Sequence, residues 1–223
     1  MEEKYLYTCH PLLSLKVNGQ SSYEAKPGET VKLTMEVEGA DSKYCSVNLY
    51  FKYSYDIVQS DVKYGNAVKY LATSPWWGGS SSSGYKYISM STAGSDNQGM
   101  DGIMFEAKLT IPEDVETGTV YPIEFLKWDD LLFTNKLNDN IGKKMQQDAF
   151  NNWQNCSIRV IGGKGDVNSD GKVTVADAVM LKKWLLAVPN AKLDNWKSAD
   201  LYDDGRIDVF DMVEMRKLLI ENK

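Results

Sequence analysis

One phrase in this sequence is written twice, and this repeat constrains the fold more than any other feature. Residues 165–186 read GDVNSDGKVTVADAVMLKKWLL and residues 199–220 read ADLYDDGRIDVFDMVEMRKLLI, so the copies start 34 residues apart. Each copy begins with a glycine-containing acidic loop and continues with apolar residues at helical spacing. Because a unit with one short helix cannot bury its apolar face alone, the two units are expected to pack together. The repeat therefore predicts a small all-α module of two loop-helix units.

The acidic loops have the side-chain spacing of a calcium loop of EF-hand type. In such a loop, alternate oxygen-bearing side chains converge on the ion and a glycine at position 6 permits the turn. Position 7 offers its backbone carbonyl, and a carboxylate at position 12 closes the shell. The alternative, two capped helices without metal, would leave the carboxylates of each loop repelling one another without a counter-ion. The expected ligands of two calcium ions are Asp166, Asn168, Asp170, Lys172 and Asp177 in the first loop and Asp200, Tyr202, Asp204, Arg206, Asp208 and Asp211 in the second.

The second loop departs from the pattern at position 3, where Tyr202 replaces Asn168. A phenol is a poor calcium ligand, since calcium prefers carboxylate, amide and carbonyl oxygens. We therefore expect the second site to bind calcium more weakly, to use water, or to recruit Asp208 at position 9.

No helix precedes the first loop, because the glycine-rich segment IGGKG (161–165) cannot supply one, and position 12 is Asp in both copies. This loop-then-helix duplication resembles the type I dockerin of cellulosome proteins, from Gly165 to the end of the chain. The leading GDVNSDG, the basic pair Lys182–Lys183 and its echo Arg216–Lys217 also match. The resemblance implies a calcium-ordered module that docks onto a cohesin module of a scaffoldin.

The resemblance also implies the residues that contact the cohesin, at loop positions 10 and 11 and at the basic pairs. Instead of contacting a cohesin, Val175 and Val209 could pack inside the module, and the basic pairs could simply be solvated. The copies differ at Ala176 against Phe210 and at Met180 against Glu214, which predicts a preference for one docking orientation. The implied contact residues are Val175, Ala176, Lys182, Lys183, Val209, Phe210, Arg216 and Lys217.

Before residue 162 the pattern changes to short segments of alternating apolar and polar residues, such as TVKLTMEV (30–37) and CSVNLYFKY (45–53). This period is that of half-buried strands, and so many of them favour an antiparallel sandwich or barrel. The segment 139–153 is expected to hold a short helix. The predicted organisation is a β-sandwich over 1–161, a short glycine-rich joint over 162–164 and the helical module over 165–223.

The order of the strand segments is similar to that of cohesins. The stretches KPGETVKLTMEVEG (26–39), VNLYFKYSYDIVQ (47–59) and GIMFEAKLTIPEDVETGTVYPIEF (102–125) follow the pattern of that family, whose fold is an all-β jelly-roll sandwich. A cohesin followed by a dockerin is the layout of an adaptor scaffoldin. The resemblance implies that this domain presents a sheet face to the dockerin of another protein and performs no chemistry.

The alternative for this domain is a carbohydrate-binding module. Its motivation is the segment SPWWGGSSSSGYKY (74–87), in which Trp76, Trp77, Tyr85 and Tyr87 could form a flat platform for sugar rings. The simpler alternative is that Trp76 anchors the serine-rich loop onto the sandwich.

Composition narrows the remaining classes of function. A net charge of −6 disfavours nucleic-acid binding, and no apolar run has the length of a membrane span. His10 is the only histidine, which argues against most catalytic sites of Ser-His-Asp type and most zinc sites. Cys9, Cys45 and Cys156 allow one disulfide or none. The chain is expected to be a secreted, non-enzymatic component of an extracellular cellulosome.

Overall fold

The computed structural model describes residues 9–74, 77–193 and 195–221 of the chain. The chain divides into two compact units, which are Met1–Tyr23 with Thr30–Thr110 and Tyr121–Ser157, and Glu24–Glu29 with Ile111–Val120 and Ile158–Lys223. The second unit thus takes in two turns of the strand-rich part as well as the helical module. The boundaries at residues 161 and 165 therefore stay a prediction.

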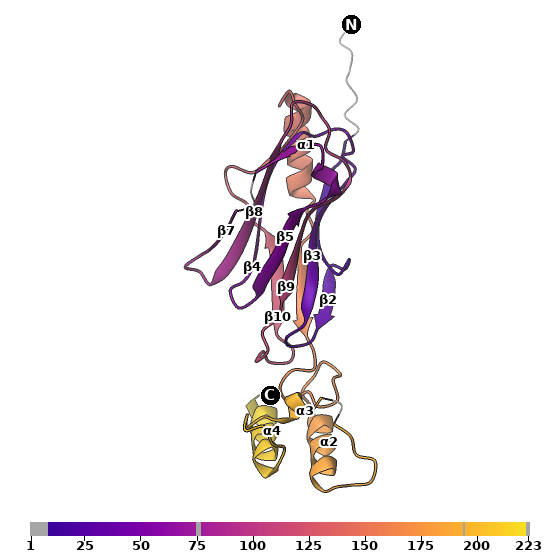
Figure 1. Cartoon of the computed structure of the whole chain (residues 1–223), viewed down its shortest axis with the longest axis vertical. Coiled ribbons are helices and arrows are strands. Elements are labelled where there is room, and N and C mark those ends of the chain that lie inside the picture. Colours follow the sequence, from indigo (N-terminus) through magenta and orange to yellow (C-terminus); the bar gives the residue numbers. More distant parts are fainter. Residues whose placement is uncertain (1–8, 75–76, 194, 222–223) are drawn as a thin grey trace. The chain divides into compact units, whose positions relative to one another are not determined.

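The strand-rich part is a sandwich of two sheets (Figure 1). The first sheet has the order β1-β3-β9-β5, with all neighbours antiparallel. Its strands are β1 (Leu12–Val17), β3 (Thr30–Glu38), β9 (Gly102–Thr110) and β5 (Val58–Tyr64).

The second sheet has the order β2-β12-β10-β4-β8-β6, and β11 and β7 extend it by pairing with β4 and β8. A 3₁₀ turn, η1 (Asn66–Val68), lies between β5 and β6. The strands are β2 (Ser22–Ala25), β12 (Cys156–Val160), β10 (Val120–Phe125), β4 (Ser46–Ser54), β8 (Tyr85–Ala93), β6 (Ala72–Thr73), β11 (Leu132–Thr134) and β7 (Trp77–Ser80).

The alternation seen in the sequence places one face of each strand in the core. On β4, Leu49 and Phe51 are fully buried, and on β3 Leu33 and Met35 are as well. The rings of Phe51 on β4 and Phe105 on β9 meet edge to face with centroids 5.7 Å apart, which joins the two sheets. The all-β sandwich predicted from the alternating segments is confirmed.

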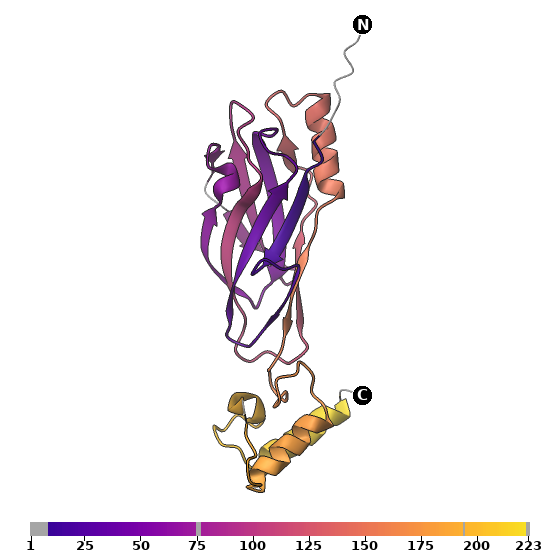
Figure 2. The same cartoon turned by 90° about the vertical axis from the view of Figure 1, so that its right-hand side faces the viewer.

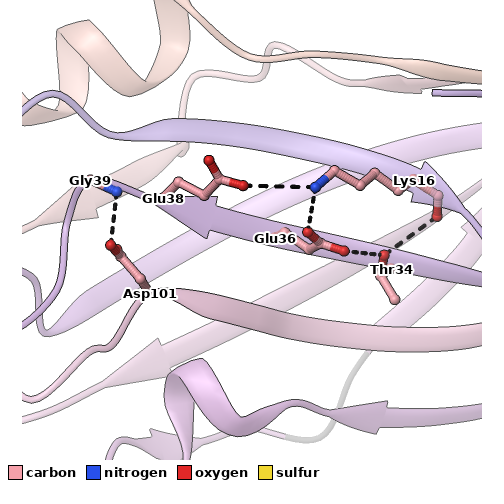
Figure 3. Close-up of polar contacts among 6 residues, drawn as sticks. All are labelled: Lys16, Thr34, Glu36, Glu38, Gly39 and Asp101. Carbon is pink, nitrogen blue, oxygen red and sulfur yellow. Dashed lines mark hydrogen bonds and ion pairs between the residues drawn. The ribbon is translucent and has the colours of Figure 1, made fainter. Parts of the chain in front are cut away.

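The outward face of the first sheet is covered by charges that neutralise one another. Lys16 donates to Glu36 at 2.6 Å and lies 3.8 Å from Glu38, while the Thr34 hydroxyl donates to the other Glu36 oxygen at 2.8 Å (Figure 3). At the end of β3, the Gly39 amide donates to Asp101 at 2.9 Å. Further ion pairs join Lys63 and Lys32 to Glu106 and Lys108 to Asp61. This face therefore offers few unpaired charges to a partner.

Helix α1 (Asn140–Asn151) confirms the short helix expected within 139–153. Asp139 caps it by accepting from the Ile141 and Gly142 amides, both at 3.0 Å. Met145 and Ala149 are buried on its inner face, which contacts β11 and β1. Figure 2 shows this helix alongside the sheets near the N-terminal end of the described chain.

The three cysteines are buried and form no disulfide. Of the two possibilities left open by the sequence, the structure therefore has the one without a bridge. Burial raises the pKa of the Cys156 thiol to about 12, which keeps it protonated and unreactive.

The C-terminal module has the predicted two loop-helix units, with helices α2 (Val175–Leu185) and α4 (Val209–Glu221) packed against each other (Figures 1 and 2). A short helix that the sequence did not predict, α3 (Trp196–Ala199), precedes the second loop. The centre of the module is a small core of fully buried side chains from both repeats. The core residues are Val167, Leu181, Ala199 and Met215.

No helix in the described residues has the length and apolarity needed to cross a membrane.

Candidate functional site

The first acidic loop wraps its backbone around the carboxylate of Asp166. One oxygen of this carboxylate accepts from the Asp170 amide at 3.0 Å. The other accepts from the amides of Gly171 at 2.9 Å and Gly162 at 2.8 Å. Gly171 has φ +82°, a conformation that residues with a Cβ rarely adopt, so the glycine at position 6 has the role that the sequence predicted for it.

The carboxylate at position 12 closes the loop from the first turn of α2. Asp177 accepts from the amides of Asn168 at 3.1 Å and Thr174 at 2.8 Å, one on each oxygen. The Thr174 hydroxyl in turn accepts from the Asp177 amide, which completes a capping box at the start of the helix, and it also accepts from the Ala176 amide at 3.2 Å. The residue that closes the loop therefore also fixes where α2 begins.

The second loop repeats the four amide bonds to these carboxylates that come from within the loop. Asp200 accepts from the amides of Asp204 at 3.3 Å and Gly205 at 2.9 Å. Asp211 accepts from the amides of Tyr202 at 3.0 Å and Asp208 at 2.7 Å. The duplicated sequence has thus produced a duplicated backbone geometry.

Four buried carboxylates in these loops lack a basic partner. Asp166 and Asp177 have no exposed surface, Asp211 is 1% exposed and Asp200 is 8% exposed. None of the four forms an ion pair with another described residue. Backbone amides donate to all four, but burial of charges without a basic partner is costly, so this set of carboxylates favours binding of a cation.

The donor chemistry of the loops fits calcium. Over the ranges that the structure describes, no three Asp, Glu, His or Cys side chains form a ready metal cluster. The first loop instead combines its two buried carboxylates with the side chains of Asn168 and Asp170, whose Nδ2 and Oδ2 are 2.9 Å apart. Calcium accepts such mixed oxygen ligands, including the position-7 carbonyl, in flexible geometry.

The two loops differ in the side chain at position 3. Asn168 is directed into its loop, where its oxygen accepts from the Asp170 amide at 3.0 Å. The Tyr202 ring instead stacks on Phe210, with ring centroids 5.4 Å apart and planes at 29°. Asp208, the other candidate ligand of this loop, caps α4 by accepting from the Phe210 amide at 2.8 Å.

The docking residues implied by the family pattern lie on the exposed sides of α2 and α4. Val175 is 68% exposed, Val209 64% and Phe210 54%. The two valines therefore do not pack inside the module. On each helix the basic pair follows on the same exposed side, so that α2 and α4 each present an exposed stripe of apolar and then basic residues. Lys217 bonds Glu214 at 2.6 Å, whereas Lys182, Lys183 and Arg216 have no ion pair with any described residue.

The outward face of the second sheet contains an aromatic cluster formed by Tyr50, Tyr87 and Trp128. The Trp128 ring lies 4.4 Å from that of Tyr50 and 5.0 Å from that of Tyr87. Tyr50 is only 7% exposed, and its hydroxyl donates to Asp130 at 2.5 Å. Burial and this carboxylate both raise the pKa of Tyr50.

Alternation along 45–53 could have placed Tyr50 on an outward face, but nothing in the sequence indicated that Trp128 folds over it from a loop. Of the aromatic platform considered for sugar binding, Tyr87 belongs to this cluster, and Tyr85 lies on the same strand beneath Lys52, 5.6 Å from its amine. Trp76 lies outside the described residues, and so does the side chain of Trp77.

Comparison with known proteins gives a separate match for each of the two parts. Residues 164–220 match the type I dockerin domain model. No curated protein matches the chain. Among solved structures, the type III cohesin module of the ScaE cell-surface anchoring scaffoldin of Ruminococcus flavefaciens has a TM-score of 0.58 at 23% identity, covering 68% of this chain and 88% of that one.

Two other similar structures are cohesins solved in complex with dockerins. The sixth cohesin of Acetivibrio cellulolyticus scaffoldin B has a TM-score of 0.48 at 12% identity, covering 67% of this chain and 98% of its own. A type I cohesin–dockerin complex from Clostridium thermocellum has a TM-score of 0.49 at 12% identity, covering 67% and 99%. Nothing in these comparisons supports a carbohydrate-binding module. The N-terminal sandwich thus has the fold of a cohesin, and residues 164–220 match a type I dockerin domain.

Proposed function

We propose that this protein is an adaptor of an extracellular cellulosome. Its dockerin module docks onto a cohesin of a scaffoldin, and its cohesin-like sandwich receives the dockerin of another protein. The observation that supports this proposal is the presence of both kinds of module, one after the other, in a single chain. Such a protein changes the binding specificity at one position of the complex. Secretion follows from this role, because cellulosomes assemble outside the cell.

The dockerin module is proposed to hold two calcium ions, one in each loop. The four buried carboxylates support this number, since each loop has two of them and neither loop supplies a basic partner. When bound, calcium neutralises these charges and orders the loops. Because the site does not exist in the unfolded chain, calcium binding adds directly to the stability of the module.

The exposed stripes of α2 and α4 are proposed to form the cohesin-binding surface. Their apolar residues at loop positions 10 and 11 are exposed, and three of the four basic residues that follow are unpaired in the described chain. A partly apolar patch with a charged rim is a common anatomy for a specific protein interface.

The sandwich is proposed to receive its dockerin on the outward face of β4 and β8. This face contains the aromatic cluster Tyr50, Tyr87 and Trp128, and aromatic residues are enriched at interface hot spots. The opposite face is a less suitable site because its charges already pair with one another.

The test is calorimetric titration of the full chain against cohesins and against dockerin-bearing proteins, with calcium present. Chelation cannot separate the two activities, because a partner dockerin needs calcium as well. The variant Asp177→Ala with Asp211→Ala should abolish binding to cohesins while leaving binding to dockerins intact. Trp128→Ala should weaken dockerin binding only, and Lys108→Ala, on the opposite sheet face, should change neither affinity. Absence of saturable binding to any dockerin would refute the adaptor role.

A further inference from the structure

We propose that Tyr202 is a docking residue rather than a calcium ligand. Its ring and that of Phe210 form one aromatic contact surface on the second repeat, which we call the Tyr202–Phe210 surface. This proposal rests on the proposed docking of the module onto a cohesin. It reassigns a position that the loop pattern gives to the metal.

The first repeat serves as an internal reference for the second. The amides of Asn168 and Tyr202 make the same hydrogen bond, to Asp177 at 3.1 Å and to Asp211 at 3.0 Å. The backbone at position 3 is therefore alike in the two loops, and only the side chain has changed direction.

The residue at position 11 explains why the Tyr202 ring turns outward. The first repeat has Ala176 there, which offers no ring, whereas the second has Phe210. The two rings stack with centroids 5.4 Å apart, a favourable geometry for an aromatic pair. Leaving the loop costs Tyr202 little, because a neutral phenol is a weak ligand for calcium.

Both rings remain largely in water. Tyr202 is 55% exposed and Phe210 54%, and the neighbouring Val209 is 64% exposed. Exposed apolar surface of this kind gains free energy when a partner covers it. Rigid aromatic rings also lose little conformational entropy on binding.

The charges beside this surface indicate the chemistry of the partner. Arg216 on α4 and Lys182 on α2 line one groove with Val209, and neither cation has an ion pair within the described part of the chain. The complementary partner is a cohesin sheet face with an apolar centre and carboxylates at its rim. The first repeat lacks the aromatic pair, so the orientation that places α4 at the centre of the interface is preferred.

Three variants of the full chain separate the two possible roles of Tyr202. Each is titrated with calcium after chelator treatment and then with the cohesin identified in the preceding experiment. Tyr202→Phe removes only the hydroxyl and should leave both affinities within about twofold. Tyr202→Ala should leave calcium affinity unchanged but weaken docking about tenfold or more, as expected for a hot spot. Tyr202→Asn, which copies the first loop, should tighten calcium binding at the second site and weaken docking.

Tyr55→Ala is the matched control, since Tyr55 is 54% exposed on the sandwich and should not affect docking of the module. Weaker calcium binding by Tyr202→Phe would show that the phenol oxygen is a ligand and overturn the proposal. Unchanged docking by Tyr202→Ala would overturn it too. A wild-type chain that binds no cohesin would refute the docking role together with the proposed function, while the calcium titration would still decide whether Tyr202 is a ligand.

Discussion

Replacing Leu181 by alanine should make folding of the dockerin module depend on calcium. Leu181 has no exposed surface and packs in the small core with Val167, Ala199 and Met215. A buried Leu→Ala change costs about 2–5 kcal/mol. A core of this size supplies only about 3–5 kcal/mol of net stability. The substitution therefore removes most or all of the stability that the module has without metal.

Calcium should restore the fold of this variant. A ligand that binds only the folded state adds about 2.7 kcal/mol at a hundredfold excess over its Kd and about 4.1 kcal/mol at a thousandfold excess. Two loops, each with two buried carboxylates, would together add about 5–8 kcal/mol, which exceeds the loss from the core.

Hydrogen exchange of the full chain provides the assay, with peptides from α2 and α4 as reporters and sandwich peptides as an internal reference. In chelator, Leu181→Ala should lower protection of both helices by about 30-fold or more, since 1.4 kcal/mol is a factor of ten. Leu186→Ala is the matched control because Leu186 is 66% exposed, and its effect should stay within about 0.5 kcal/mol. Equal protection of the two variants in chelator would refute the core assignment, and failure of calcium to restore protection would refute the argument from buried carboxylates.

Three further predictions concern the sandwich. Burial raises the pKa of Tyr53 to about 12 from its ordinary value of 10.0, so the folded chain keeps this proton where the unfolded chain has lost it. The free energy of unfolding should therefore decrease as the pH rises from 10.0 to about 12, and denaturant titrations should show a smaller decrease for Tyr53→Phe. Cys9, Cys45 and Cys156 should react with a thiol reagent only after unfolding, and a count below three would indicate a disulfide. Hydrogen bonds from the Gly142 amide and neighbouring groups lower the pKa of Asp139, so its capping of α1 should be lost as the pH falls below 3.8. Asp139→Ala should speed hydrogen exchange over α1 at neutral pH. Unchanged exchange would contradict the capping role.

Local sequence determined the features that depend on residue spacing. The glycine at position 6 and the carboxylates at positions 1 and 12 predicted both loops, because these contacts close within twelve residues. Alternation of period two predicted the sandwich, since it dictates which face of a strand is buried.

Tertiary structure alone decided the contacts between residues distant in sequence. Trp128 covers Tyr50 because the loop after β10 folds over β4, and no spacing in the sequence encodes that contact. The sequence alone does not tell whether Val175 and Val209 are buried, because the core of the module forms from Leu181 and Met215 of the same two helices instead. Tyr202 was recognised as unusual from the sequence, but only the folded loop showed that its ring stacks on Phe210, because the direction of a side chain is set by the neighbours that three-dimensional packing provides.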